Sequence, residues 1–259
     1  MPDVMLLAVV QGLTEFLPVS SSGHLVAVRH FLRIADVQGT AFDAFLHLGT
    51  LAAVLVYYWR VWWGVTRGVF VHDGEGRDKQ HLAAKLALAT VPGAVVGYFL
   101  QGEIADQLRT PGIVATGLLV TAGLLLLGDF LYVSAQKKHR AAYQDAMVIG
   151  LAQMFALLPG LSRSGTTIAV GRSRGLSRQQ ATNFSFLMSA PIIAGAGLSS
   201  LASLIASGGF NTAEMVVGFG VSFLSGLAAI HILLKLIERI SFVPFAIYLV
   251  ALAAALMMW

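Results

Sequence analysis

A hydroxyl-rich segment occurs twice in this chain, each time inside a long apolar stretch. Residues 20–28 and 162–170 align at an offset of 142, with serine, glycine, alanine and valine recurring in step. The same offset pairs four more positions of the two halves: Gln11 with Gln153, Thr40 with Thr182, Phe42 with Phe184 and Ala52 with Ala194. Paired interrupted helices are typical of membrane proteins whose polar site lies between two repeats. We therefore expect repeats over approximately residues 1–133 and 145–259.

The composition indicates an integral membrane protein. Hydrophobic residues make up 57% of the chain and charged residues 12%, whereas soluble domains carry about 25% charged residues. There is no cysteine, which excludes disulfides, thiolate metal centres and cysteine nucleophiles. The net charge of +4 does not indicate nucleic-acid binding, because the basic residues cluster at the ends of apolar runs. We expect no cleaved leader, since Glu15 lies too early for one.

Six apolar runs are long enough to cross a bilayer, which takes about 20 residues. They cover residues 44–63, 84–101, 111–133, 185–207, 213–236 and 243–259. Two further stretches, 4–33 and 145–172, are broken by Pro18 and by Pro159-Gly160, and we interpret each as a re-entrant hairpin. Such breaks at membrane depth must be buried in protein or line a wet cavity. The prediction is an all-α integral membrane protein, one domain over residues 1–259, with six transmembrane helices and two re-entrant helix-loop-helix hairpins in an inverted-topology repeat.

The charged loops predict the orientation. The connections at residues 60–85 and after residue 133 are rich in lysine and arginine, which places them in the cytoplasm. The short connection with Glu103 and Asp106 then lies outside, and so do both termini. We interpret residues 71–80 as a flexible loop, and three arginines as ordinary positive-inside residues: Arg172, Arg174 and Arg178.

Gln11 and Glu15 stand four residues apart, on one face of the first apolar helix. A carboxylate at membrane depth is costly and usually functional, as a proton carrier, an ion-pair member or a metal ligand. The alternatives are a structural ion pair between Glu15 and Arg163, and interhelical hydrogen bonding for Gln11. Asp43 could join a metal site, although a solvated helix end is the favoured interpretation.

The segment from Ser20 to His24 begins a helix with three hydroxyls and a glycine. Such a helix start offers backbone amides and the positive end of the dipole to an anion such as phosphate. His24 follows Ser21 by three residues, so its imidazole could reach that hydroxyl as a general base, or attack phosphorus itself. The alternative is a packed or capping histidine.

Arg163 marks the second copy of the segment, between Ser162 and Ser164. Its planar fork of donors suits bidentate binding of phosphate, and a buried arginine needs anionic company. The alternative is an anchor at the membrane surface, which the flanking hydroxyls disfavour. Candidate substrate-binding residues of the two copies are Ser20, Ser22, Gly23, Ser162, Ser164, Gly165 and Thr167.

Residues 11–24 and 159–167 closely resemble the two signature motifs of the bacterial undecaprenyl-diphosphate phosphatases, also called bacitracin-resistance proteins. Further similarity lies in residues 45–50, 183–187 and 239–248, so the resemblance covers essentially the whole chain. It implies a metal-dependent phosphoanhydride hydrolase that converts undecaprenyl diphosphate to undecaprenyl phosphate and inorganic phosphate. This reaction recycles the lipid carrier of cell-wall synthesis and confers bacitracin resistance. The resemblance also implies a multi-pass protein of the bacterial cytoplasmic (inner) membrane whose site opens to the outer face.

The family's functional residues carry over to seven positions: Glu15, Ser20, Ser21, His24, Ser162, Arg163 and Thr167. Glu15, together with Gln11, would hold Mg²⁺ or Ca²⁺, because hard cations take oxygen ligands. Gln11 departs from the paired-acid motif and cannot bind a cation with a full charge. Either Ser21 is the nucleophile with His24 as base, or His24 activates water. The expected partners are a polyprenyl diphosphate and the membrane, with no nucleic acid. The sequence does not distinguish a homodimer from a monomer.

A transporter is the rival interpretation, because inverted repeats with half-helices at the midplane are common among carriers. A carrier would flip the lipid and need not break a bond. The set Ser21, His24 and Arg163 favours the enzyme, since a binding site alone does not require it. A non-catalytic scaffold is the third and least favoured interpretation.

Overall fold

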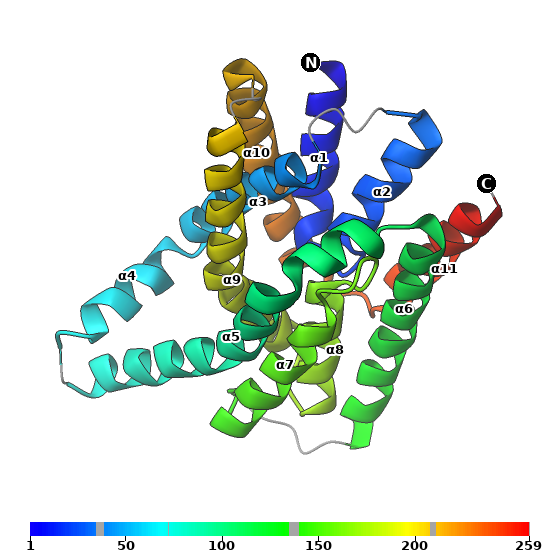
Figure 1. Cartoon of the computed structure of the whole chain (residues 1–259). Helices are drawn as coiled ribbons and strands as arrows, with labels where there is room; N and C mark the ends of the chain where they lie inside the picture. The colour runs from blue at the N-terminus through cyan, green and yellow to red at the C-terminus, as the bar shows by residue number, and fades with distance from the viewer. Residues whose placement is uncertain (35–38, 72, 135–139, 208–210, 259) are drawn as a thin grey trace.

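The computed structural model describes residues 1–34, 39–71, 73–134, 140–207 and 211–258, all of them helical or in connecting turns. The expected all-α fold is confirmed over these residues (Figure 1). The helices are α1 (Pro2–Phe16), α2 (Ser21–Leu32), α3 (Gly39–Tyr57), α4 (Trp59–Gly68), α5 (Gly74–Gln107), α6 (Pro111–Ser134), α7 (Tyr143–Phe155), α8 (Arg163–Ser173), α9 (Arg178–Ser207), α10 (Thr212–Leu236) and α11 (Val243–Met258).

Both predicted helix breaks are confirmed. The first lies between α1 and α2 and contains Pro18, and the second lies between α7 and α8 and contains Pro159 and Gly160. The second helix of each pair starts in the same way. The hydroxyls of Ser20 and Ser162 accept hydrogen bonds from backbone amides three residues on, at 3.2 and 3.0 Å, which satisfies a donor that the helix start leaves free.

The two broken pairs enter the bundle from opposite sides and meet near its centre (Figure 1). A hydrogen bond joins them where they meet, from the Ser164 hydroxyl to the carbonyl of Leu17 at 2.8 Å. α1 packs against α10, and α7 packs against α5. At the offset of 142, α1 corresponds to α7 and α5 overlaps α10, so each half covers the hairpin of the other.

Glycine permits the closest of these contacts. A Cβ atom on Gly12 of α1 would lie 2.7 Å from the carbonyl oxygen of Ser222 on α10, and one on Gly150 of α7 would lie 2.5 Å from that of Ala89 on α5. Gly160 turns the α7–α8 connection with a φ of +86°, a conformation that only glycine adopts without strain. Small residues of this kind let membrane helices pack backbone to backbone.

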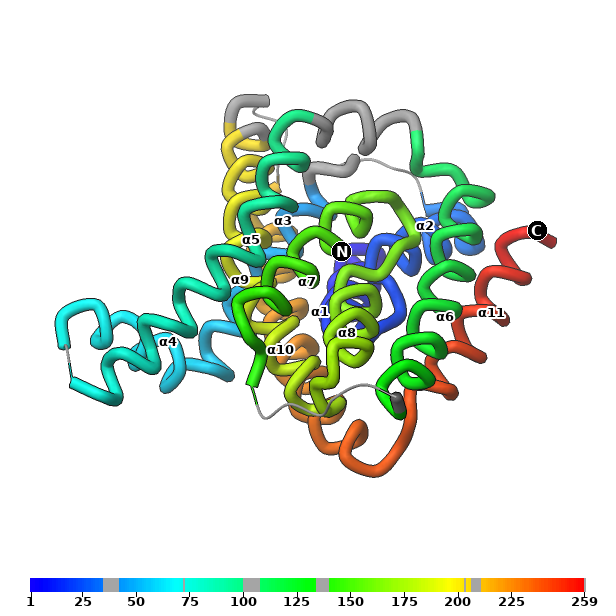
Figure 2. Tube along the Cα trace, turned by 90° about the horizontal axis from the view of Figure 1, so that it is seen from below, coloured from blue at the N-terminus to red at the C-terminus, as the bar shows by residue number. Residues whose placement is uncertain are grey.

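Four helical segments are long and apolar enough to cross a membrane: Gly74–Phe99, Pro111–Val133, Arg178–Ala202 and Thr212–Leu236. A fifth span exists if α3 and α4 count as one, while α11 is apolar but shorter. The chain is therefore a multi-pass helical membrane protein. Figure 2 shows α6 and α11 side by side on one flank, where they pack together.

The expected continuous span at residues 44–63 is wrong in one respect. The helix breaks at Tyr58, and α4 leaves α3 at 75° to run beside the start of α5 (Figure 1). Neither proline nor glycine stands at the break. At the break, the Tyr58 hydroxyl donates to Asn183 Oδ1 on α9 at 2.5 Å. The sequence around Tyr58 does not predict this long-range contact.

The expected loop at residues 71–80 is also wrong from Gly74 onward, because α5 begins there. Asp73 caps the helix, and its carboxylate accepts the amide of Gly76 at 2.7 Å. An aspartate followed by acidic and basic helix formers is the ordinary start of a helix.

Two aspartates near the ends of the hairpins are each held between two arginines. Asp43 on α3 is 2% exposed and lies 2.7 Å from Arg29 and 3.1 Å from Arg109. It is therefore not a solvated helix end. Asp129 on α6 contacts Arg172 at 2.8 Å and Arg178 at 2.9 Å.

The interpretation of the second-half arginines as ordinary positive-inside residues is accordingly wrong for Arg172. This side chain is 5% exposed, and its guanidinium lies 3.4 Å from the centre of the Tyr132 ring. Arg174 binds the buried carboxylate of Asp145 at 3.0 Å. These charges fix the carboxyl-terminal end of α8 to its neighbours.

Candidate functional site

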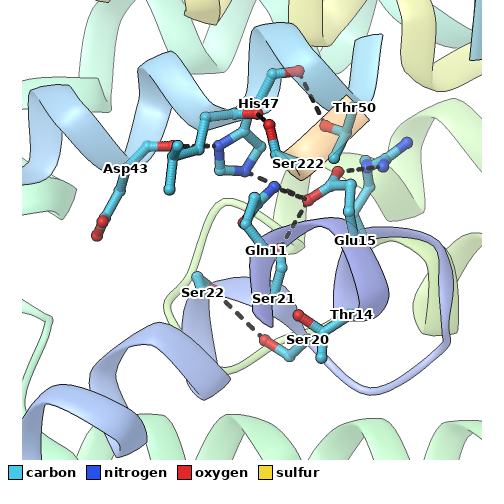
Figure 3. Close-up of polar contacts among 12 residues, drawn as sticks. Gln11, Thr14, Glu15, Ser20, Ser21, Ser22, Asp43, His47, Thr50 and Ser222 are labelled. Atoms are coloured by element: carbon cyan, nitrogen blue, oxygen red, sulfur yellow. Dashed lines mark hydrogen bonds and ion pairs between the residues drawn. The ribbon is translucent and has the colours of Figure 1, made fainter. Parts of the chain in front are cut away.

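Glu15, at the end of α1, is the centre of a polar cluster at the break between α1 and α2. It is 6% exposed. One carboxylate oxygen accepts from Gln11 Nε2 at 2.9 Å and from the Ser21 hydroxyl at 2.7 Å. The other accepts from Arg163 Nη2 at 2.6 Å. Figure 3 shows Gln11 and Ser21 directed at this carboxylate. The structure thus brings together four of the predicted residues, three from the first broken pair and one from the second.

His47 on α3 is a member of the cluster that the sequence reasoning missed. Its Nε2 lies 3.3 Å from the carboxylate of Glu15, and its Nδ1 lies 2.8 Å from the carbonyl of Asp43 (Figure 3). Both ring nitrogens face acceptors, so the geometry suits a ring that carries both protons. The available signal was a histidine inside an apolar span, because ionisable residues at membrane depth are functional candidates.

His24 does not lie where the sequence reasoning placed it. Its Nδ1 lies 2.8 Å from the carbonyl of Ser20, and its Nε2 lies 2.7 Å from the hydroxyl of Tyr248 on α11. The expected contact with Ser21 is wrong, because both ring nitrogens have other partners and Ser21 donates to Glu15. Since a carbonyl only accepts, Nδ1 carries the proton in the contact with Ser20.

The role of this contact follows from the backbone of Ser20. Its φ is +69°, in a region that residues other than glycine rarely adopt. His24 holds the carbonyl of this strained residue, and Tyr248 holds His24, with the two rings stacked 5.5 Å apart. Tyr248 is a second residue that sequence reasoning missed, since it stands at the far end of the chain.

The second copy of the segment is arranged by its own hydroxyls. The Ser162 amide donates to Thr121 on α6 at 3.0 Å, and the hydroxyls of Ser162 and Ser164 lie 3.1 Å apart. Thr167 lies further back, where its hydroxyl donates to the carbonyl of Arg163 at 2.8 Å and lies 2.7 Å from the Ser185 hydroxyl. Its contacts therefore support Arg163.

Gly23 and Gly165, both predicted to bind substrate, have a packing role. A Cβ atom on Gly23 would lie 3.1 Å from Leu118, and one on Gly165 would lie 2.6 Å from Thr121. Both neighbours belong to α6. The two glycines let the starts of α2 and α8 approach the same helix closely.

A cavity of about 230 Å³ opens at the junction of the two segments. Its lining includes eight polar residues: Glu15, Ser20, Ser21, Ser22, His47, Ser162, Arg163 and Ser164. One donor of Arg163, Nη1, is buried and has no hydrogen-bond partner among the described residues. Buried unpaired donors beside serine hydroxyls and two helix starts suit an anion with several oxygens, such as a phosphate group.

The ligand atoms near Glu15 determine which kind of cation site is feasible. Within the described residues, no group of three or more His, Cys, Asp or Glu side chains could hold a metal ion. Glu15 supplies carboxylate oxygens, and Oε1 of Gln11 is a buried acceptor without a hydrogen-bond partner in the described structure. Magnesium is commonly bound through one or two carboxylates together with substrate phosphates. The two residues therefore fit a cation that takes its other ligands from a bound diphosphate.

The contact between His24 and Tyr248 gives a first prediction. Tyr248→Phe should lower turnover about fivefold, because a lost hydrogen bond of about 1 kcal/mol loosens the ring that holds Ser20. The stacked rings should preserve the fold. Turnover and the thermal midpoint measure the two effects.

The matched control is Tyr57→Phe, which removes a hydroxyl that lies 3.4 Å from His231 in an exposed pair elsewhere. This control should keep full turnover. Equal turnover in both variants would contradict the role of Tyr248.

Known proteins resemble the chain over nearly its full length. Residues 4–255 match the protein family described as bacitracin resistance protein BacA. The undecaprenyl-diphosphatase of Desulforudis audaxviator is 43% identical over 252 residues, 96% of this chain and 93% of that protein. The one of Rubrobacter xylanophilus is 44% identical over 260 residues, 97% and 95% of the two chains. Undecaprenyl-diphosphatase 2 of Stutzerimonas stutzeri is 40% identical over 261 residues, which cover 98% of this chain and 96% of that protein. With the family match spanning both broken helix pairs, the chain belongs to the bacitracin resistance protein BacA family.

Proposed function

We propose that this protein is a membrane phosphatase that hydrolyses undecaprenyl diphosphate to undecaprenyl phosphate and inorganic phosphate. The observation that carries the proposal is the meeting of Ser21 from one half and Arg163 from the other on the carboxylate of Glu15, in one cavity. Relatives that share about 40% of their residues with nearly the whole chain carry this activity in their names. The reaction recycles the lipid carrier of the cell wall and thereby confers bacitracin resistance.

Ser21 is the nucleophile in this proposal. Its hydroxyl proton points at Glu15, 2.7 Å away, so the carboxylate can take that proton as the oxygen attacks the terminal phosphorus. The bond from phosphorus to the bridging oxygen breaks, and undecaprenyl phosphate leaves. Water then releases phosphate from the phosphoserine. Glu15 replaces His24 as the base, because His24 contacts Ser20 and Tyr248.

Arg163 stabilises the charge on the transferring phosphoryl group. Its Nη2 donates to Glu15, while its Nη1 has no protein partner in the described structure. The protein therefore fixes the guanidinium through Nη2, and Nη1 is available to bind a phosphate oxygen. The hydroxyls of Ser20, Ser22, Ser162 and Ser164 supply further donors. A bound Mg²⁺ or Ca²⁺ would neutralise charge on the diphosphate oxygens.

The test is phosphate release by the purified protein in detergent from a C55 diphosphate, with and without a chelator. Release that disappears in Ser21→Ala supports the enzyme. A protein that moves the lipid across vesicle membranes without releasing phosphate would instead be a carrier, the rival of the same architecture.

The arrangement in the membrane is part of the proposal. Six spans, two re-entrant hairpins and inverted repeats over residues 1–133 and 145–259 account for the opposite entry of the two broken pairs (Figure 1). We place both termini and the cavity toward the outer face of the bacterial cytoplasmic membrane, with the basic connections in the cytoplasm.

Thiol labelling tests this orientation, because the chain has no cysteine of its own. Thr110→Cys, in the connection between α5 and α6, should react with an impermeant reagent added outside intact cells. Arg140→Cys, before α7, should react only after the membrane is opened. The reverse pattern would overturn the orientation.

Gln11→Glu tests the cation. If both side chains face one cation, the new carboxylate should lower the cation concentration needed for half-maximal activity, because opposite charges attract strongly in a site of low dielectric. Phosphate release is measured against added Mg²⁺ or Ca²⁺. The matched control is Gln153→Glu at the corresponding position of the second half.

The alternative for Gln11 is a purely structural hydrogen bond. In that case the new charge would be buried against Glu15 without a partner, and the thermal midpoint would fall with the cation dependence unchanged. This result would remove Gln11 from the cation site.

A further inference from the structure

The cavity has two unlike walls, and the chemistry proposed above uses only one of them. The polar wall carries Glu15, His47 and Arg163. The rest of the lining is hydrocarbon and comes from the α7–α8 connection and the middle of α9: Ala156, Leu157, Leu161, Ile192, Ile193 and Ala196. A diphosphate is charged and does not bind through contacts with an apolar surface.

The repeat explains why the walls differ. At the offset of 142, Leu157 is the counterpart of Glu15, and both side chains line the same cavity. His47 has Ser189 as its counterpart. At the position of Glu15, the first copy of the repeat therefore presents a carboxylate to the cavity, and the second copy presents hydrocarbon.

The size of the cavity limits what it encloses. Clefts that bury most of a drug-sized ligand measure roughly 300 to 1,000 Å³, and this cavity measures about 230 Å³. It can enclose a diphosphate and the beginning of a tail, but not a chain of many isoprene units. The rest of the tail must leave through an opening.

Ala196 marks such an opening. It lines the cavity and is at the same time exposed on the surface of α9. Leu198 on the same helix is 59% exposed, and Phe155 at the end of α7 is 64% exposed. Exposed apolar residues on a membrane-spanning helix face lipid, so the mouth at Ala196 leads from the cavity into hydrocarbon.

We propose that Leu157, Ile192 and Ile193 form a subsite for the first isoprene units of a polyprenyl diphosphate, and that the remaining tail passes into the bilayer over Ala196. This subsite rests on the proposed function, since it accommodates the tail of the same substrate. It fixes the direction in which the lipid lies across the cavity.

Ala196→Phe tests the subsite by filling the mouth. The substrates are a C55 diphosphate and dimethylallyl diphosphate, which share the head group but differ in the tail beyond the first unit. The loss of kcat/KM on the long substrate should exceed the loss on the short one about tenfold or more, as for a bulky group in an apolar pocket. Ala202→Phe, another exposed alanine of α9 outside the lining, should give equal, small changes on both.

Two outcomes overturn the subsite. Equal losses on both substrates would assign Ala196 to the head group or the fold, and unchanged rates on both would mean that the tail leaves elsewhere. A binding readout keeps the test independent of hydrolysis: undecaprenyl phosphate should raise the thermal midpoint of the unaltered protein and of Ala202→Phe, but not of Ala196→Phe. Absence of phosphate release from the unaltered protein would sink the proposed function while leaving this readout intact.

Discussion

Replacing Arg163 by lysine should lower turnover by about three orders of magnitude, the effect typical of losing an arginine that stabilises a transferring phosphoryl group. The guanidinium holds Glu15 with one nitrogen at 2.6 Å and leaves the other without a protein partner in the described structure. Lysine is a point charge and can serve only one of these directions. Phosphate release measures turnover, and the thermal midpoint shows whether the fold survives.

Arg140→Lys is the matched control. Arg140 also pairs with a carboxylate, that of Asp78 at 2.8 Å, but its side chain is 77% exposed. Exposed ion pairs contribute little to stability, so this variant should behave like the unaltered protein. Near-normal turnover in Arg163→Lys would remove the guanidinium from the chemistry and leave it as a structural partner of Glu15.

Ser21→Ala should be the second severe variant, with a loss of at least about a thousandfold, as in other enzymes that lose their nucleophile. The small change keeps the fold, because Ser21 is only partly buried and its one described contact is with Glu15. Ser22→Ala is the comparison, since it lines the same cavity but lies 3.3 Å from Ser20 instead of Glu15. Its loss should be far smaller.

A rapid-quench experiment tests whether the reaction passes through a phosphoserine intermediate. Labelled diphosphate should leave labelled phosphoserine at position 21 before phosphate appears in solution. If Ser21→Ala is inactive but no phosphoenzyme forms in the unaltered protein, Ser21 positions an attacking water and Glu15 is the base for that water.

The helix breaks were predictable because their signals are local. Pro18, Pro159 and Gly160 disfavour the continuation of a helix, and Ser20 and Ser162 cap the helices that follow. The bend at Tyr58 was not predictable, because its partner Asn183 lies on α9, far along the chain. An apolar run shows that a segment is buried or in lipid, but not which distant side chain bends it.

In the site, too, some features were predictable from the sequence and others were not. Glu15 and Arg163 were expected as an ion pair or as catalytic residues, and the structure places them 2.6 Å apart; their roles stay predictions. The expected contact between His24 and Ser21 is wrong, because spacing along a helix favoured His24 over a carboxylate six residues before the serine. The turn at Ser20 reverses that ranking, since it swings the Ser21 hydroxyl back toward the end of α1.

The reciprocal packing of the hairpins also constrains how the protein is made. α1 emerges from the ribosome well before its main neighbour, α10, which begins only at Thr212. Until that helix is synthesised, the amino-terminal hairpin carries Glu15 without the arginine that pairs with it, in a membrane where an unpaired charge is costly. We expect the first hairpin to remain near the membrane surface, or with a helper protein, until the carboxyl-terminal half arrives. Assembly of the catalytic centre would then be the last event of biogenesis.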